Sequence, residues 1–475
     1  MLFHTPEFLI LFIITFIIYY LPGAQNFQLL LLIISSFVFY AWHIPLLVIL
    51  LIGSILLNAL VSFRIAHSRA QKAWAAAGIT ANLLILAFFK YSSLLARTFL
   101  PADHIAGFLL SIPLPVGISF YTFQGISLLA DVLRSRYEKR PDYQVQIALD
   151  FTGHLRQTAL FIAFFPQLVA GPIVKAYDFL PQIKGKFLKD IDWNFAVKAL
   201  VTGYFLKTVI ADNLKDYTVW ISWPFFNSLS TLTLLSALFG YSMQIFADFA
   251  GYSLIAIGLA ALFGYTLRIN FNFPYLAKSC SEFWSRWHIS LSSWLKEYLY
   301  ISLGGNRKGS LRTYFNLFIV MFLGGLWHGA AWSYAIWGTW HGLALAIERF
   351  IGKLMSAKVK NFLEKPAVLF LRILLVFFFV TISWLLFKLP EFKHVLFFIS
   401  AFFSNINTAH KTSLVFAVLL YSLPVIFYYI LHALQSEYNQ FKAVFSYAAP
   451  FVYGVMLFLI IINSGEPGAF IYFQF

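Results

Sequence analysis

Two histidines and a few polar residues are the strongest candidates for chemistry in this sequence. His328 lies in the small-residue stretch Gly324 to Trp332, between long apolar runs. A histidine buried among apolar side chains tends to lose its proton, so its imidazole can accept a proton from a hydroxyl group. The competing interpretation is helix packing, in which small residues let two backbones approach and His328 bonds a carbonyl. These residues by themselves favour neither interpretation.

Ser279 to Tyr300 is predicted to form one amphipathic helix. Ser279 and Glu282 have the spacing of a capping box. Large apolar side chains recur at steps of three and four, and polar side chains form a second stripe. The first stripe is Trp284, Trp287, Leu291, Trp294 and Tyr298, and the second is Arg286, Ser290, Ser293 and Glu297. Such a helix lies in the membrane interface or lines a cavity. His288 falls on neither stripe, and a lone histidine there is more often structural than catalytic.

Further polar candidates lie on both sides of this segment. Asp248 stands in an apolar run, and Gln244 lies one helical turn earlier on the same face. Asp248 is either a polar wall of an internal cavity or the cap of a helix at the interface. Arg307 and Lys308 belong to a glycine-rich basic turn that could meet phosphate groups. The turn lacks the full phosphate-loop pattern.

A metal site is not expected. His341 repeats the Trp-His-Gly signature of His328, but no Cys or Glu/His spacing accompanies it. Cys280 is the single cysteine, which excludes both an intramolecular disulfide and a metal cage built of cysteines.

The elements that must position these residues are membrane-spanning helices. Of 475 residues, 60% are hydrophobic and only 11% are charged, against about 25% charged in soluble domains. This composition excludes a disordered chain, a nucleic-acid-binding domain and an ordinary soluble enzyme. The net charge of +15 comes from basic residues between apolar runs, as expected for cytoplasmic loops. We predict an all-α polytopic integral membrane protein with a single domain over residues 1–475.

Thirteen apolar runs are candidates for membrane spans. They are Phe8–Leu21, Phe27–Trp42, Leu46–Phe63, Trp74–Phe89, Phe108–Leu129, Phe195–Ile210, Ser230–Phe246, Tyr252–Tyr265, Tyr314–Trp327, Trp332–Ile347, Ala367–Leu386, Leu414–Leu431 and Pro450–Ile462. The short stretch Ala159 to Pro172 lies between two basic loops, so a re-entrant segment is predicted there. Three spans between Lys189 and Arg307 would put these two residues on opposite sides of the membrane. If they share a side, another piece of the chain is re-entrant.

Several longer motifs together carry a resemblance. They are Asn82 to Tyr91, Pro115 to Gln124, Phe165 to Ile173, Asn270 to Tyr275, Phe283 to Ser292, Tyr298 to Arg307, Trp327 to Gly329 and the terminal peptide Phe470 to Phe475. In combination they resemble the membrane-bound O-acyltransferase family, and within it the branch that acetylates alginate and peptidoglycan. The basic turn and the terminal aromatic peptide favour this branch over the one that transfers D-alanine.

The resemblance implies about 11–13 transmembrane helices, with re-entrant or interfacial helices, around a central tunnel in a bacterial inner membrane. It implies acetyl-CoA as the donor from the cytoplasm, an exported glycan as the acceptor, and a periplasmic partner protein. His328 matches the catalytic histidine and His288 a second functional histidine. Asn272, Trp287 or His288 would orient the thioester carbonyl. Gln244, Asp248, Trp327, Arg307 and Lys308 would line the tunnel or bind the donor. D-alanyl transfer to teichoic acid and a non-enzymatic transporter remain the alternatives.

Overall fold

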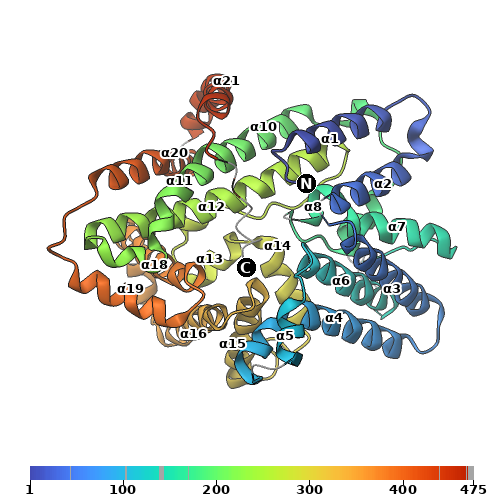
Figure 1. The fold of residues 1–475 in the computed structure, drawn as a ribbon, viewed down its shortest axis with the longest axis horizontal. Helices are drawn as coiled ribbons and strands as arrows, with labels where there is room; N and C mark the ends of the chain where they lie inside the picture. Colours follow the sequence, from blue (N-terminus) through green and yellow to red (C-terminus); the bar gives the residue numbers. More distant parts are fainter. Residues whose placement is uncertain are drawn as a thin grey trace. The chain divides into compact units, whose positions relative to one another are not determined.

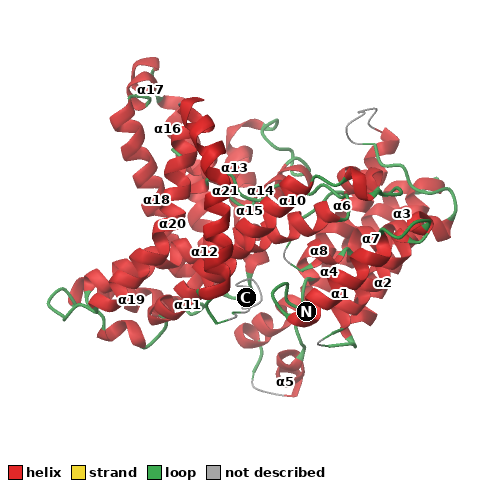
Figure 2. Cartoon of the chain, turned by 90° about the horizontal axis from the view of Figure 1, so that it is seen from above, coloured by secondary structure: helices red, strands yellow, loops and turns green. Residues whose placement is uncertain are grey.

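The computed structural model describes residues 1–42, 44–101, 104–137, 144–169, 171–437, 439–466 and 468. Its regular secondary structure is helical, and the described residues contain no β-strand (Figure 2). The predicted all-α class is therefore confirmed. The basic loop predicted before Ala159 consists of Arg134, Arg136, Lys139 and Arg140. Lys139 and Arg140 of this loop, and the terminal peptide Phe470 to Phe475, lie outside the described residues.

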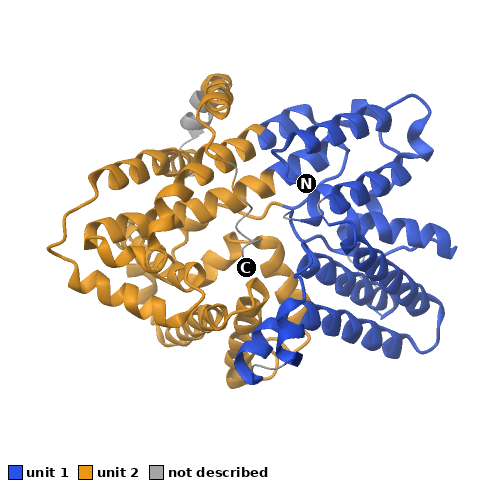
Figure 3. Ribbon diagram, in the orientation of Figure 1, with its two compact units in different colours: residues 1–200, 255–268 blue, residues 201–254, 269–475 orange. Residues whose placement is uncertain are grey.

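The chain forms two compact units (Figure 3). Unit 1 comprises residues 1–200 and 255–268, and unit 2 comprises residues 201–254 and 269–475. The division falls within two helices, α10 (Trp193–Tyr204) and α12 (Thr231–Leu262), so the units are not successive halves of the chain. A single domain over residues 1–475 remains a prediction.

Unit 1 contains the first group of helices (Figure 1). These are α1 (Pro6–Tyr19), α2 (Gln28–Ala41), α3 (Leu47–His67), α4 (Gln71–Phe99), α5 (His104–Ser111), α6 (Ile118–Tyr137), α7 (Phe151–Ala163), α8 (Phe165–Leu168) and α9 (Ala176–Phe179). Helix α3 packs against α4, α6 and α7. Polar side chains join these helices: Asn82 donates to Asn58 at 3.0 Å, and Ser62 bonds His154 at 2.7 Å. Such bonds satisfy polar groups that lipid or apolar side chains would leave unpaired.

Unit 2 holds the candidate site. After α10, its helices are a π-helical turn (Phe205–Ala211), α11 (Asp212–Thr218), α12, α13 (Cys280–Arg286), α14 (Ile289–Trp294), a second π-helical turn (Leu295–Tyr300), α15 (Gly309–His328), α16 (Trp332–Leu354), α17 (Ala357–Leu363), α18 (Pro366–Lys388), α19 (Phe392–Ser404), α20 (Thr412–Glu437) and α21 (Asn439–Ile462). Helices α15 and α16 pack together as an antiparallel pair, and α16 also contacts α13 and α18.

Six helices in the described part of the chain are long and apolar enough to cross a membrane: α3, α4, α12, α15, α18 and the first 24 residues of α20. Four further apolar helices are shorter: α1, α2, α19 and the second part of α21, Tyr447–Ile462. Helices α1 and α2 have 14 residues each, which gives about 21 Å at 1.5 Å per residue, less than the ~30 Å hydrocarbon core. The protein is a multi-pass membrane protein, and the number of about 11–13 transmembrane helices remains a prediction.

Two predicted boundaries are wrong. The structure has one continuous helix, α12, where two spans were predicted, Ser230–Phe246 and Tyr252–Tyr265. Asp248 and Gly251, which were expected to lie at or beyond a helix end, lie inside it. The number of helices expected to cross between Lys189 and Arg307 therefore falls from three to two. The run Phe108–Leu129 is divided between α5 and α6 by an irregular stretch that contains Pro113 and Pro115, since proline cannot donate the backbone bond of a continuing helix.

The stretch predicted to be re-entrant contains only short helices. Helix α7 has 13 residues and α8 has four, so neither has the length to cross a bilayer. Residues 159–169 are all buried. Irregular backbone at membrane depth is tolerated where protein surrounds it, so this arrangement fits a re-entrant segment.

Candidate active site

A close helix pair places His328. His328 is the last residue of α15, and α16 starts at Trp332. A Cβ atom on Gly325 would lie 2.2 Å from the Tyr334 carbonyl oxygen, and one on Gly338 would lie 2.3 Å from the Met321 carbonyl oxygen. Only glycine permits such an approach of the two backbones. The predicted role of small residues around His328 is confirmed.

Aromatic rings surround the imidazole of His328. Its ring centroid lies 5.1 Å from that of Trp327, 5.2 Å from Trp337 and 5.3 Å from Phe387. Its side chain is buried, with 3% of its surface exposed. A proton acceptor in such a water-poor environment interacts more strongly with a bound polar substrate than it would in water.

His288 lies at a break between two helices, which corrects the sequence prediction. The expected single helix Ser279–Tyr300 is wrong, because α13 ends at Arg286 and α14 begins at Ile289. The capping part of the prediction holds, since the Ser279 hydroxyl accepts from the Glu282 backbone N–H at 3.0 Å. His288 itself adopts a left-handed backbone conformation, with φ +44°. Such conformations are uncommon outside glycine and concentrate at functional sites.

Asn270, in the segment before α13, stabilises the break between α13 and α14. The Asn270 carbonyl accepts from the Ile289 N–H at 2.9 Å, and its side-chain oxygen accepts from the Ser290 N–H at 3.2 Å. These N–H groups start α14 and have no partner within their own helix. Asn270 satisfies both from outside, so the chain restarts as a new helix instead of continuing the old one. No periodicity in the sequence pointed to Asn270.

Asn272 forms hydrogen bonds to Arg286, the last residue of α13. Its N–H donates to the Arg286 carbonyl at 3.0 Å, and its carbonyl accepts from the Arg286 guanidinium at 3.2 Å. Glu282 fixes the same guanidinium at 2.7 Å. The Asn272 side chain is exposed, so the structure gives this residue a main-chain role at the break. Its predicted role at the thioester carbonyl remains a prediction.

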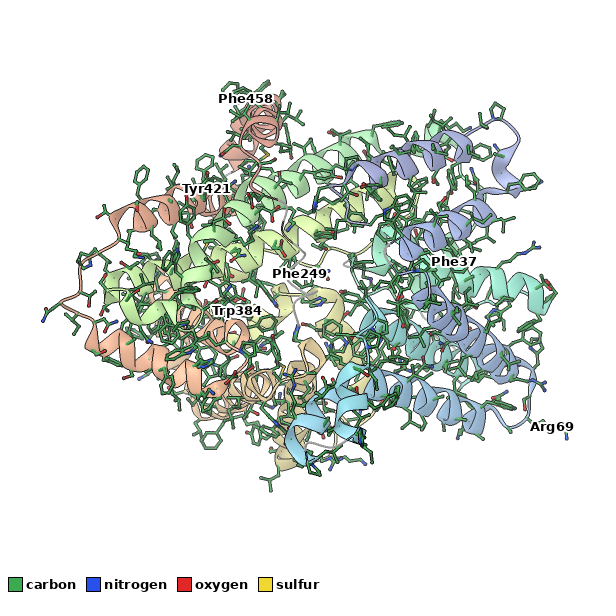
Figure 4. All side chains as sticks on the ribbon, in the orientation of Figure 1. Phe37, Arg69, Phe249, Trp384, Tyr421 and Phe458 are labelled. Carbon is green, nitrogen blue, oxygen red and sulfur yellow. The ribbon has the colours of Figure 1, made fainter. Side chains whose placement is uncertain are left out.

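The structure brings the two histidines together. Their ring centroids are 6.3 Å apart, and Trp327 lies 5.9 Å from His288. Phe249, labelled in Figure 4, meets His288 edge-on at 4.6 Å. His288 is fully buried and lies outside the six candidate spans; burial lowers the pKa of its imidazole to about 3. The ring is therefore uncharged near neutral pH and able to donate one hydrogen bond and accept another.

An aromatic shell, formed by Trp284, Trp287, Trp337 and Trp384, packs around the two histidines. Trp287 is buried against Phe271 at 4.9 Å and against Trp384, also labelled in Figure 4, at 5.1 Å. Trp384 stacks on Trp337, the ring that touches His328. Trp287 is therefore separated from His328 by intervening rings. Trp327 contacts both histidines directly.

His341 also belongs to this shell. Its ring packs against Trp337 at 4.9 Å and Trp284 at 5.2 Å, and its Nε2 bonds the Ser383 hydroxyl at 3.1 Å. Because Trp337 touches His328, His341 supports the candidate base through a neighbouring ring.

Asp248 belongs to a buried cluster of charged residues with Lys207 and Asp212, and this cluster was not predicted from the sequence. Lys207 Nζ lies 2.6 Å from Asp248 and 2.8 Å from Asp212, and it donates to the Gly468 carbonyl at 3.2 Å. The helix-cap interpretation of Asp248 is wrong, since Asp248 is inside α12. Lys207 could have been found, because it is an ionisable residue inside the predicted span Phe195–Ile210. Gln244, one turn earlier on α12, accepts from the Thr218 hydroxyl.

The basic turn lies at the opposite end of α15 from His328. Arg307 and Lys308 are exposed just before α15 begins. Gly304 and Gly305 have positive φ angles, and Asn316 donates to the Gly305 carbonyl at 2.9 Å. The 20 residues of α15 span about 30 Å at 1.5 Å per residue. Arg307 and Lys308 are therefore too far from His328 to act at the same atoms.

A small pocket adjoins His328 within unit 2. Its volume is about 100 Å³. Its walls come from α13, α14, the turn after α14, α15 and α16, and are mainly apolar. They are Trp284, Leu291, Ser292, Leu295, Val320, Met321, Gly324, His328 and Trp337.

Residues 109–389 match the membrane-bound O-acyltransferase family. The chain belongs to this family. The matched range contains both histidines, the aromatic shell and the pocket. The protein is thus an O-acyltransferase, and the resemblance read from its motifs is confirmed.

Two bacterial acetyltransferases are similar over most of the chain. The probable alginate O-acetylase AlgI of Pseudomonas aeruginosa is 36% identical over 459 residues, covering 93% of this chain and 83% of the relative. The peptidoglycan O-acetyltransferase of Helicobacter pylori is 35% identical over 422 residues, covering 83% and 78%. The teichoic acid D-alanyltransferase of Bacillus subtilis is 27% identical over 292 residues, covering 59% and 70%.

Replacing His288 by alanine in this O-acyltransferase is expected to slow ester formation by about 10²–10³-fold. A neutral imidazole 6.3 Å from the His328 ring can orient a substrate, and the loss of one such hydrogen-bond donor has a cost of that order. Initial rates of the purified variant measure the effect. Unchanged rates would restrict His288 to a structural role.

Proposed function

We propose that this O-acyltransferase moves an acetyl group from cytoplasmic acetyl-CoA to a hydroxyl group of an exported glycan, of the alginate or peptidoglycan type. The observation that carries the proposal is His328, buried at the end of α15 beside a small apolar pocket. The similarity to acetylating relatives over most of the chain supports acetyl, and the D-alanylating relative is similar over a shorter part.

The chemistry needs a base, orientation and charge stabilisation. The neutral imidazole of His328 accepts the proton of the attacking hydroxyl as its oxygen forms a bond to the thioester carbonyl carbon. The carbonyl oxygen becomes an oxyanion, for which the neutral His288 ring is a candidate donor. When the C–S bond breaks, the imidazolium returns the proton to the thiolate. The products are an oxygen ester and a free thiol.

The position of the pocket supports entry of the donor along α15. Val320, Met321 and Gly324 line the pocket one to two helical turns before His328, on the side of the basic turn. A thioester at His328 would extend its long pantetheine arm toward Arg307 and Lys308. These two exposed cations offer charge-assisted hydrogen bonds to the phosphates of coenzyme A.

The acceptor reaches the transferred group from the opposite face of a bacterial inner membrane in this proposal. Basic loops mark the cytoplasmic side, and an exported glycan lies beyond the other side. A periplasmic partner protein would carry the acetyl group onward. Gln244, Asp248, Asn272, Trp287 and Trp327 are the further residues assigned to the substrate path.

Incubating the purified protein with [14C]acetyl-CoA and a soluble glycan oligomer tests the donor. We expect free coenzyme A and an alkali-labile acetyl ester to appear together. Thioester consumption that requires a D-alanyl carrier protein instead would favour the teichoic-acid-type reaction. Vesicle flux without any ester would favour a transporter.

A further inference from the structure

The buried charge cluster of Lys207, Asp212 and Asp248 lies next to a ring that touches His288. Asp248 is followed on α12 by Phe249, whose ring centroid lies 4.6 Å from that of His288. We propose that Phe249 is a positioning residue for His288. The ion pair of Lys207 with Asp248 sets the register of α12 and thereby places the Phe249 ring. This inference rests on the proposed function, in which His288 donates to the oxyanion, and it adds residues that act on the reaction through His288.

Phe249 packs against one side of the His288 imidazole. The two ring planes are at 87° to each other, and both side chains are fully buried. Edge-to-face contact is a preferred arrangement of aromatic rings. Phe271 packs on Phe249 with a centroid distance of 4.9 Å, and on Trp287 at the same distance. Because these rings interdigitate, Phe249 has little room to turn, and it restricts the orientation of the imidazole beside it.

The backbone of His288 leaves the direction of its ring to side-chain contacts. His288 lies between α13 and α14 in a left-handed conformation, so no helical turn of its own restricts the rotamer. Asn270 holds this backbone through the two N–H groups that start α14. The ring itself packs against Phe249 at 4.6 Å and against Trp327 at 5.9 Å. Phe249 is therefore the closer of these two rings that direct the His288 nitrogen atoms.

The ion pair gives α12 a single register. Most of the apolar part of α12 is buried, and apolar side chains alone specify the register of a helix less strictly than one buried polar contact does. Lys207 Nζ lies 2.6 Å from the Asp248 carboxylate, and both side chains are buried. A shift of α12 by one residue would move this carboxylate by about 1.5 Å along the helix axis and rotate it by about 100°. The contact would then be lost, and both charges would stay buried without each other.

Lys207 is itself fixed, so it cannot follow Asp248 if α12 moves. An ammonium group has three N–H donors. In this cluster their acceptors are Asp248, Asp212 at 2.8 Å and the Gly468 carbonyl at 3.2 Å. The position of the Asp248 carboxylate is therefore set from outside α12.

The position of Phe249 follows from that of Asp248. Consecutive residues point about 100° apart around a helix. When the Asp248 carboxylate is directed at Lys207, the next side chain, Phe249, faces an adjacent side of α12, where it meets His288. The charge cluster thus acts on the candidate oxyanion donor through one residue.

Phe249→Leu tests the contact with His288. We expect kcat for acetyl transfer to fall about tenfold while KM for acetyl-CoA stays within about twofold, because a misdirected donor weakens the transition state and leaves donor binding intact. Phe246→Leu is the matched control: Phe246 is also a buried phenylalanine of α12, and its ring packs against Tyr275 and Tyr429. It should keep the wild-type kcat. Equal losses of kcat in the two variants would overturn the proposal.

A double-mutant cycle shows whether Phe249 acts through His288. In a His288→Ala background, Phe249→Leu should lower kcat by less than about twofold, because the ring that Phe249 positions is absent. The same loss of kcat as in the wild-type background would assign Phe249 to packing alone and would refute the positioning role.

Two variants of Asp248 test the register of α12. Both leave Lys207 paired with Asp212, so the charge of the cluster stays balanced. Asp248→Asn keeps an oxygen that can accept from Lys207 Nζ, whereas Asp248→Leu has a similar size and no acceptor. We expect kcat of Asp248→Leu to be at least about fivefold below that of Asp248→Asn, and this difference should vanish in the His288→Ala background. Equal kcat values in the two variants would show that the ion pair does not set the register.

Failure of the proposal and failure of the proposed function give different results. If wild-type protein forms no ester from acetyl-CoA, the proposed function fails. If wild-type protein forms the ester and Phe249→Leu keeps the wild-type kcat, only the positioning role of Phe249 fails. Wild-type rates in His288→Ala would remove the donor role of His288 and the positioning role together.

Discussion

Replacing His328 by alanine is expected to reduce acetyl-ester formation by about 10²–10⁴-fold, the usual contribution of a positioned general base. The imidazole is buried among Trp327, Trp337 and Phe387, so bulk water has little access to replace it as the proton acceptor. The loss should appear in kcat, because the proton is transferred in the chemical step. Initial rates with [14C]acetyl-CoA measure it.

The control for this variant separates chemistry from folding. His67→Ala removes an exposed histidine at the end of α3 and should retain wild-type rates. The His328→Ala protein should elute as the wild type does from a gel-filtration column and bind acetyl-CoA with similar affinity. Wild-type rates in that variant would refute the assignment of His328 as the base.

Replacing Lys207 by methionine is expected to destabilise the protein by about 3–5 kcal/mol, the cost of leaving buried charge without its partner. Lys207 is 1% exposed and bridges Asp212 and Asp248. Methionine keeps the length of the side chain but leaves two buried carboxylates facing each other. The midpoint of thermal unfolding in detergent, and the yield of folded protein, measure the effect.

Neutralising the whole cluster should reverse most of this loss. The triple variant Lys207→Met, Asp212→Asn and Asp248→Asn removes the unpaired charges, and replacing a complete buried ion cluster is often close to neutral in stability. Lys198→Met changes an exposed lysine on α10 and should shift the free energy of unfolding by less than about 0.5 kcal/mol. A similarly small shift in Lys207→Met would show that the cluster does not stabilise the fold.

The class of the protein and several of its spans could be read from composition and length. Apolar runs near 20 residues specify helices because lipid offers no partner for exposed backbone groups. The runs at Leu46, Trp74, Tyr314, Ala367 and Leu414 became α3, α4, α15, α18 and α20. The length of an apolar run gave the wrong helix boundaries in two places. Prolines divide one run into α5 and α6, and two expected spans are joined in α12.

The candidate base could also be found from the sequence, through motif resemblance and the small residues around it. The backbone at His288 could not, since side-chain periodicity carries no information about hydrogen bonds from a distant segment. Asn270 accepts both N–H groups that start α14. That contact converts one predicted helix into two and turns His288 toward His328.

The sequence by itself determined an all-helical membrane protein, the family, and the two histidines. Each of these depends on residue types and local order along the chain. The tertiary structure decided which partners those residues have: Lys207 for Asp248, Trp337 for His328, and Leu295 for Gly324. These contacts join different helices, and they exist only once the helices have packed.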